Sequence, residues 1–232
     1  MPYGEIADNL RRVQDEIAAA AGRAGRDPGE VALVVVTKTR DLDEVRAAVA
    51  AGAVDLGENY VQEMEAKAEA LADADVRWHA IGHLQTNKVR RIAPFVSLVH
   101  SVDSARVARE LDTRASAAGR RVPFLLQVNV SGEDSKFGIG VDSAEALALE
   151  VCGLDGARLV GLMTMPPYVE DPEANRPHFQ RLREVRERLV AAGVPEADLR
   201  HLSMGMSGDF GVAVEEGATL VRVGTAIFGS RD

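Results

Sequence analysis

A lysine closes a strongly apolar stretch of the chain. Lys38 follows the run VALVVV (31–36), with only Thr37 in between. A short run rich in β-branched residues is typical of a strand that is buried on both faces of a parallel sheet. A lysine at the end of such a strand is partly shielded from water, which favours the neutral amine that a Schiff base requires. The alternative is a lysine that ends the strand and extends its ammonium group into water.

Two turns near the end of the chain combine glycine with a hydroxyl group. Ser207 lies in GMSG (205–208), just before a predicted helix, and Gly224 is followed by Thr225. The backbone N–H groups of glycine-rich turns and of helix starts can bind a phosphate. The alternative is that Ser207 or Asp209 caps the helix and that the glycines only form tight turns.

The spacing of apolar residues predicts helices and strands in regular alternation. Ile6, Leu10, Val13 and Ile17 share one face of a first helix. The predicted strands cover residues 31–36, 54–56, 77–81, 96–100, 123–130, 158–163, 199–202 and 219–223. The predicted helices between them cover residues 43–51, 59–72, 86–93, 104–118, 143–152, 173–192 and 209–216, and a closing turn runs through 224–229.

Alternation of this kind predicts an α/β fold with a parallel sheet, and eight strands in 232 residues predict a closed (β/α)8 barrel of the TIM type. An open doubly wound sheet is the alternative, but its G-x-G-x-x-G turn is missing, since TKTR (37–40) follows the first strand. Without a linker or repeat, we expect residues 1–232 to form a single barrel domain with an N-terminal helix. Functional residues of a barrel lie where its strands end, so Lys38 and the turns at Ser207 and Gly224 are expected to meet there.

The composition argues against several classes of partner. A net charge of −9 disfavours nucleic acid and anionic membranes. No apolar stretch approaches the roughly 20 residues that span a bilayer. The single cysteine, Cys152, leaves no internal disulfide, which fits a reducing cytosol, and the first ten residues do not resemble a signal peptide. We therefore expect a cytoplasmic protein with no nucleic-acid or membrane partner.

His79 and His83 have the four-residue spacing of a metal-binding pair. However, Gly82 and the end of a predicted strand separate them, and no acidic or cysteine ligand clusters with them in the sequence. A zinc site needs such further ligands, so we expect no metal.

Seven short motifs resemble the pyridoxal phosphate homeostasis protein family. They are VVTK (35–38), GENY (57–60), WHAIGHLQTNK (78–88), SKFGI (135–139), GLMTM (161–165), LSMGMS (202–207) and RVGTAIFG (222–229). Each motif is weak by itself, but the ordered set covers nearly the whole chain and is specific.

The resemblance implies a barrel like the N-terminal domain of alanine racemase, the fold of type III pyridoxal 5′-phosphate (PLP) enzymes. It implies that Lys38 carries PLP as a Schiff base. It also implies a cofactor site in which Ser207, Gly224 and Thr225 hold the phosphate, Arg222 faces the pyridine nitrogen and Asn59 lies near the cofactor. An arginine at that nitrogen disfavours its protonation, so the ring withdraws electrons less strongly. Lys136 matches a second lysine of the family, a candidate for a secondary PLP contact or for transfer; its alternative is a loop lysine in water.

The resemblance implies a role in intracellular PLP homeostasis, in which the protein holds PLP and buffers it or delivers it to PLP-dependent apoenzymes. The alternatives are a weak amino-acid racemase or other fold-type III PLP enzyme, and a barrel that binds another phosphorylated metabolite. Racemisation by two bases needs an acid/base group on each face of the substrate α-carbon.

In alanine racemase the second base comes from a C-terminal domain, whereas this chain ends at Asp232. Tyr3 and Tyr168 are poorly placed to replace that base, and Tyr60 begins a predicted helix near the mouth. We therefore assign no catalytic residue and expect a PLP carrier or regulator with little racemase turnover. Without the second domain and its dimer contacts, we expect a monomer.

Overall fold

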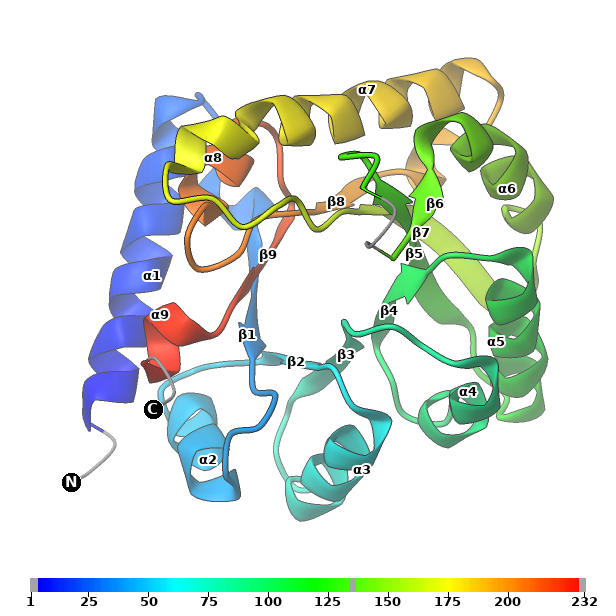
Figure 1. Ribbon diagram of the computed structural model, residues 1–232. Coiled ribbons are helices and arrows are strands. Elements are labelled where there is room, and N and C mark those ends of the chain that lie inside the picture. The colour runs from blue at the N-terminus through cyan, green and yellow to red at the C-terminus, as the bar shows by residue number, and fades with distance from the viewer. Residues whose placement is uncertain (1–3, 134–136, 230–232) are drawn as a thin grey trace.

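The computed structural model describes residues 4–133 and 137–229, which form a closed barrel of parallel strands enclosed by helices (Figure 1). Its eight strands are β1 (Ala32–Val36), β2 (Asp55–Glu58), β3 (Arg77–Ala80), β4 (Leu98–Val102), β5 (Val122–Asn129), β7 (Ala157–Met163), β8 (His201–Ser203) and β9 (Leu220–Val223). β1 pairs with both β2 and β9, and β4 pairs with β5, which closes the ring. The predicted barrel is thereby confirmed, and the first and last strands are neighbours.

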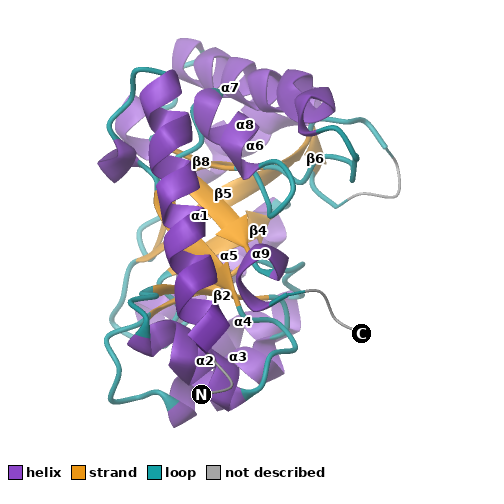
Figure 2. Ribbon diagram, turned by 90° about the vertical axis from the view of Figure 1, so that its left-hand side faces the viewer, coloured by secondary structure: helices purple, strands orange, loops and turns teal. Residues whose placement is uncertain are grey.

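The helices form the outer layer of the barrel (Figure 2). They are α1 (Gly4–Arg23), α2 (Leu42–Ala50), α3 (Val61–Ala70), α4 (Thr86–Ile92), α5 (Ala105–Ala117), α6 (Ala144–Val151), α7 (Arg176–Ala191), α8 (Phe210–Glu215) and α9 (Thr225–Phe228). Short 3-10 turns lie at Pro28–Glu30, Val141–Ser143, Pro172–Asn175 and Glu196–Asp198. α1 packs against α8 and α9, so the N-terminal helix covers the barrel beside its last strand.

Alternation along each strand divides the core into two layers. Val35, Val99 and Val221 belong to the large apolar layer between strands and helices, where every outer helix buries one face. Their neighbours point into the barrel and form a second apolar cluster of Val34, Leu98, Leu125, Val160, Met163 and Leu220. This separation follows from the two-residue period of a strand, and it fills the barrel interior with side chains rather than with a channel.

Three features of the fold differ from the prediction. β4 ends two residues later than predicted, which moves His100 from a strand end into the barrel wall. The predicted closing turn contains the short helix α9, which begins at Thr225. A two-residue strand, β6 (Ile139–Gly140), pairs with β5 beyond the barrel and carried no periodic signal in the sequence.

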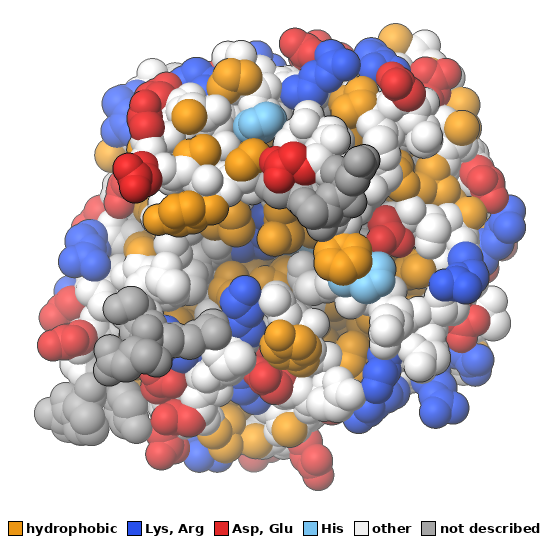
Figure 3. All heavy atoms as spheres, viewed as in Figure 1, with side chains coloured by type: hydrophobic (Ala, Val, Ile, Leu, Met, Phe, Trp, Pro, Cys, Tyr) orange, Lys and Arg blue, Asp and Glu red, His pale blue; other side chains and the backbone are white. Residues whose placement is uncertain are grey.

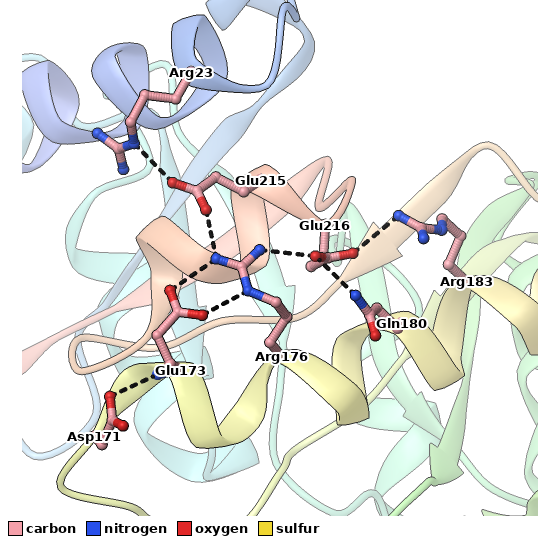
Figure 4. A network of polar contacts seen from close by, with 8 residues as sticks. All are labelled: Arg23, Asp171, Glu173, Arg176, Gln180, Arg183, Glu215 and Glu216. Carbon is pink, nitrogen blue, oxygen red and sulfur yellow. Dashed lines mark hydrogen bonds and ion pairs between the residues drawn. The ribbon is translucent and has the colours of Figure 1, made fainter.

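A network of ion pairs ties α8 to its neighbours (Figure 4). The Arg176 guanidinium on α7 donates to Glu173 at 2.6 Å, to Glu215 at 2.7 Å and to Glu216 at 2.8 Å. The remaining partners are Arg23 of α1 and Gln180 and Arg183 of α7. Two carboxylates at the end of α8 oppose its helix dipole, and the three arginines offset that unfavourable interaction. The network fixes α8, and α8 begins directly after the turn that contains Ser207.

Candidate functional site

A cavity of about 510 Å³ opens at the carboxyl ends of the strands. Its size is within the usual range of small-molecule sites. The face shown in Figure 3 is hollowed near its centre, with hydrophobic side chains along the edge and basic side chains within the hollow. The lining includes all the described residues that the sequence analysis assigned to a cofactor: Lys38, Asn59, Ser207, Arg222, Gly224 and Thr225. Lys136 lies outside the described residues.

Lys38 is the second residue of a tight turn at the end of β1. The turn is closed by the Arg40 N–H, which donates to the Thr37 carbonyl oxygen at 3.0 Å. Thr39, the third residue, has a φ of +58°, a backbone conformation that β-branched residues rarely adopt. Such strain persists only where neighbouring structure holds it in place. The half-buried Lys38 side chain therefore extends into the cavity from a constrained backbone.

The groups that hold this turn come from β2 and α3. The Thr39 N–H donates to Glu63 Oε2 at 2.7 Å, and the buried Thr37 hydroxyl donates to Glu58 Oε1 at 2.7 Å. Lys67 Nζ donates to the Thr37 carbonyl oxygen at 2.7 Å and to Glu58 Oε1 at 2.6 Å. Burial raises the pKa of the Glu58 carboxyl, while hydrogen bonds from Lys67 and Thr37 act in the opposite direction. Lys67 thus supports the turn directly and also compensates the buried carboxylate beside it.

Replacing Lys67 with methionine is expected to destabilise the fold by about 3–5 kcal/mol, the typical result of leaving one partner of a buried ion pair alone. Without Lys67, the pKa of Glu58 in the folded protein lies further above its value in the unfolded chain. The folded state then binds the extra proton, so the deficit in stability is smallest at low pH and grows as the pH rises.

Urea unfolding of wild type and Lys67→Met at about pH 5 and about pH 8 measures this dependence. Lys88→Met, on the partly exposed face of α4, is the matched control and should unfold like the wild type at both pH values. A Lys67→Met protein as stable as the control at the higher pH would contradict the assignment.

The two glycine turns meet beside the end of β1, because β9 pairs with β1 and β8 with β9. Ser207 Oγ accepts hydrogen bonds from the backbone N–H groups of Gly224 at 3.2 Å and Ala226 at 3.3 Å. Gly205 in the same turn has a φ of +92°, and an added Cβ would lie 2.6 Å from the Ala213 Cβ, so this position requires glycine. Asp209 makes no side-chain cap to α8. The hydroxyl of Ser207 therefore faces the second turn and does not cap the helix, which removes the capping alternative.

Arg222 is a buried cation in the wall of the cavity, and its residue is 4% exposed. Its guanidinium donates from Nη1 to Ser203 Oγ at 2.5 Å and from Nη2 to the Thr164 carbonyl oxygen at 2.9 Å. Burial lowers the pKa of Arg222 to about 10, which is still far above neutral pH. No carboxylate among the described residues pairs with it. Arg222 therefore presents a charged donor to whatever occupies the cavity.

Asn59 reaches the cavity because of a close backbone contact. A Cβ at Gly82 would lie 2.5 Å from the Asn59 carbonyl oxygen, so only glycine lets the loops after β2 and β3 approach this closely. This contact places the half-buried Asn59 on the cavity wall.

The two histidines considered as a metal pair point in different directions. His79 Nε2 lies 2.8 Å from Asp55 Oδ1 inside the barrel, whereas His83 stacks on Phe137 with ring centroids 4.3 Å apart at the mouth. No group of three or more His, Cys, Asp or Glu side chains within residues 4–133 and 137–229 is arranged to hold a metal ion.

Several exposed apolar residues surround the mouth, and the sequence analysis missed them. Phe137 and Met165 line the cavity, and Tyr168, which was considered poorly placed, lines it as well. The Tyr168 residue is 92% exposed, so its ring lies at the rim in water. The loop sequence gave no periodic signal for this position.

Comparison with known proteins gives a consistent result. The chain matches the family described as alanine racemase, N-terminal domain, over residues 6–232. It is 43% identical to the pyridoxal phosphate homeostasis protein of Aquifex aeolicus, over 97% of both chains, and 45% identical to that of Pseudomonas aeruginosa, over 98% of this chain and 96% of the relative. The solved structure of PipY from Synechococcus elongatus with PLP bound has a TM-score of 0.83 and 35% identity, covering 97% of this chain and 100% of PipY. Within the described residues, no helix is long and apolar enough to span a membrane.

Proposed function

The chain belongs to the pyridoxal phosphate homeostasis protein family, and on this premise we propose that its barrel mouth is a PLP site built on Lys38. The protein binds PLP and acts in PLP homeostasis. The observation that carries the proposal is the convergence of a lysine, two hydroxyl-bearing glycine turns and a buried arginine on one cavity.

The donor set fits the chemical groups of PLP. Lys38 supplies a primary amine, which is the group that attaches an aldehyde as a Schiff base. Ser207, Gly224 and Thr225 supply hydroxyl and backbone N–H groups, which suit a phosphate. The Arg222 guanidinium can donate hydrogen bonds but cannot accept them, which matches an unprotonated ring nitrogen. Asn59 follows β2, the neighbour of β1, and from the cavity wall it would contact the ring substituents.

When bound, PLP supplies an electron-withdrawing pyridine ring and an aldehyde that reacts with amines. The residues of this chain determine how far that reactivity is used. Arg222 carries a permanent charge and disfavours a proton on the ring nitrogen beside it, because two positive charges would then be adjacent. This environment suits holding the cofactor better than stabilising a carbanion.

The proposal extends to the wider role of the protein. We propose a cytoplasmic carrier or regulator, a monomer with one barrel domain over residues 1–232, that buffers PLP and delivers it to PLP-dependent apoenzymes. Lys136 would make a secondary PLP contact. Tyr168 at the rim is the specific feature that favours the alternative, a weak racemase or other PLP enzyme, because its hydroxyl could act as a second acid/base group.

One experiment separates the carrier from the racemase. PLP-loaded protein, from which unbound PLP has been removed, is divided between an apo-aminotransferase and L-alanine. We expect the apoenzyme to regain activity as the carrier loses its visible absorption band, and D-alanine to form no faster than with PLP alone. Appreciable D-alanine that disappears in Tyr168→Phe would overturn the carrier proposal in favour of the enzyme, and failure to reactivate the apoenzyme would refute delivery.

A further inference from the structure

A continuous chain of polar side chains crosses the apolar interior of the barrel. Starting at the cavity, Arg222 Nη1 lies 2.5 Å from Ser203 Oγ, and Ser203 Oγ lies 2.8 Å from His100 Nδ1. His100 Nε2 lies 2.9 Å from His79 Nδ1, and His79 Nε2 lies 2.8 Å from Asp55 Oδ1. All five residues are at most 7% exposed. Asp55 is held at the far end by two 2.6 Å hydrogen bonds from Arg77.

The two ends of this chain determine its direction. A guanidinium can only donate hydrogen bonds, and an ionised carboxylate can only accept them. Burial raises the pKa of Asp55, but hydrogen bonds from His79 and Arg77 outweigh it and lower the pKa to about 2, so the carboxylate is ionised at neutral pH. While both histidine rings are neutral, each link therefore runs the same way: Arg222 donates to Ser203, Ser203 to His100, His100 to His79, and His79 to Asp55.

This direction assigns a proton to each histidine. Both rings are neutral and carry their proton on Nε2, because Nδ1 of each ring is the acceptor of the preceding link. With a charged His79, His100 would carry its proton on Nδ1, and both His100 and Arg222 would donate to Ser203 Oγ. The Ser203 hydroxyl proton would then have no acceptor among the described residues, an unfavourable state for a fully buried group.

The surroundings of His100 favour the same state. His100 is fully buried, and burial together with the nearby Arg222 charge holds the pKa of its ring well below the usual value for histidine. A proton on His100 would add a second positive charge next to the Arg222 guanidinium, in a region of low polarity. Among the described residues, no carboxylate hydrogen-bonds to Arg222, although the charge of Asp209 acts on it.

We infer that His100 and Ser203 are positioning residues that hold Arg222 as a charged donor against the ligand. The neutral His79 and His100 rings link Ser203 to the Asp55 carboxylate, and this carboxylate determines the direction in which the hydrogen bonds run. The inference rests on the proposed function only for the identity of the ligand. Ser203 Oγ is the acceptor that anchors Arg222 Nη1, and in this arrangement its hydroxyl donates to His100 and so is fully satisfied.

The direction of the hydrogen bonds between Arg222 and Asp55 is tested on protein without cofactor. Protein labelled with 15N-histidine is examined by two-dimensional NMR, which distinguishes the two neutral tautomers and the charged ring. At neutral pH, His79 and His100 should both be neutral with the proton on Nε2, and Ser203→Ala should shift the His100 Nδ1 signal while leaving that of His201 in place. A charged ring, or a proton on Nδ1 of either histidine, would overturn the inference.

The positioning role is tested with PLP and two variants of His100. His100→Leu removes both links, whereas His100→Gln retains one acceptor and one donor. We expect the PLP dissociation constant of His100→Leu to rise by about 10- to 100-fold, the usual effect of removing an outer partner of a site. We also expect the visible absorption maximum of bound PLP to move, and His100→Gln to restore both largely.

His201→Gln is the matched control, because the His201 ring bonds to Thr219 and is not a link in the hydrogen-bonded chain from Arg222 to Asp55. Equal spectra and affinities in His100→Leu, His100→Gln and the control would refute the positioning role. If His100→Leu does not fold, Ser203→Ala provides the same comparison. A wild-type protein that takes up no PLP would refute the proposed function. The histidine tautomers of the cofactor-free protein would still show in which direction the hydrogen bonds from Arg222 to Asp55 run.

Discussion

Replacing Lys38 with alanine should abolish the visible absorption band of PLP-loaded protein. Lys38 is the only described lysine that lines the cavity: Lys67 is bound behind the turn to Thr37 and Glu58, and Lys88 lies on α4. Without the Lys38 amine, the cofactor is held only by hydrogen bonds to its phosphate and ring. We expect the dissociation constant to rise by about a hundredfold or more, equivalent to about 2.8 kcal/mol.

Two variants make this result specific to the amine. Lys38→Arg retains the positive charge but cannot form a Schiff base, so it should lose the band as completely as Lys38→Ala. Lys88→Ala changes a lysine of α4 that does not line the cavity and should keep the band unchanged. Spectra and affinities are measured by titration with PLP, and a full band in Lys38→Ala would show that another amine carries the cofactor.

The second large effect is expected from Ser207→Asp, because it introduces a negative charge against the phosphate. Ser207 lies between the two turns, with the Gly224 and Ala226 N–H groups directed at its oxygen. Two unit charges about 4 Å apart interact with about 4 kcal/mol near a protein surface, and the phosphate carries more than one charge. We therefore expect the affinity for PLP to fall by about a hundredfold or more.

The control for this prediction is a change in the ligand. Pyridoxal lacks the phosphate, so its affinity should be nearly the same for the wild type and Ser207→Asp. Ser207→Ala, which removes one hydroxyl without adding charge, should lower PLP affinity much less. An equal loss of PLP and pyridoxal binding in Ser207→Asp would mean that the substitution damages the cavity as a whole and that the phosphate lies elsewhere.

The barrel and the convergence of the predicted residues could be predicted from the sequence because both depend on local patterns. The run before Lys38 and the turn residues around Ser207 and Gly224 mark strand ends, and a closed parallel barrel brings strand ends together. The distance along the chain between Lys38 and Ser207 is irrelevant once β1 pairs with β9 and β9 with β8.

The residues that surround and hold the site could not be predicted in this way, because their contacts depend on how strands, helices and loops are aligned in three dimensions. The predicted strand at 96–100 ended two residues early, so His100 was placed at an edge and its links to His79 and Ser203 were not visible. Lys67 lies on a helix whose pattern gives no reason to expect contact with Thr37, thirty residues earlier in the chain. Tyr168 reaches the rim through an irregular loop, where no periodicity specifies direction.

The proposed PLP site depends most directly on which amine carries the cofactor, and borohydride reduction followed by peptide mass mapping of the wild-type protein determines this. The chain has four lysines, at positions 38, 67, 88 and 136, so the peptides that contain them are readily distinguished. We predict a stoichiometric pyridoxyl group on Lys38, with at most a weaker second label on Lys136. A main label on Lys67, Lys88, Lys136 or the terminal amine, with Lys38 unmodified, would contradict the account.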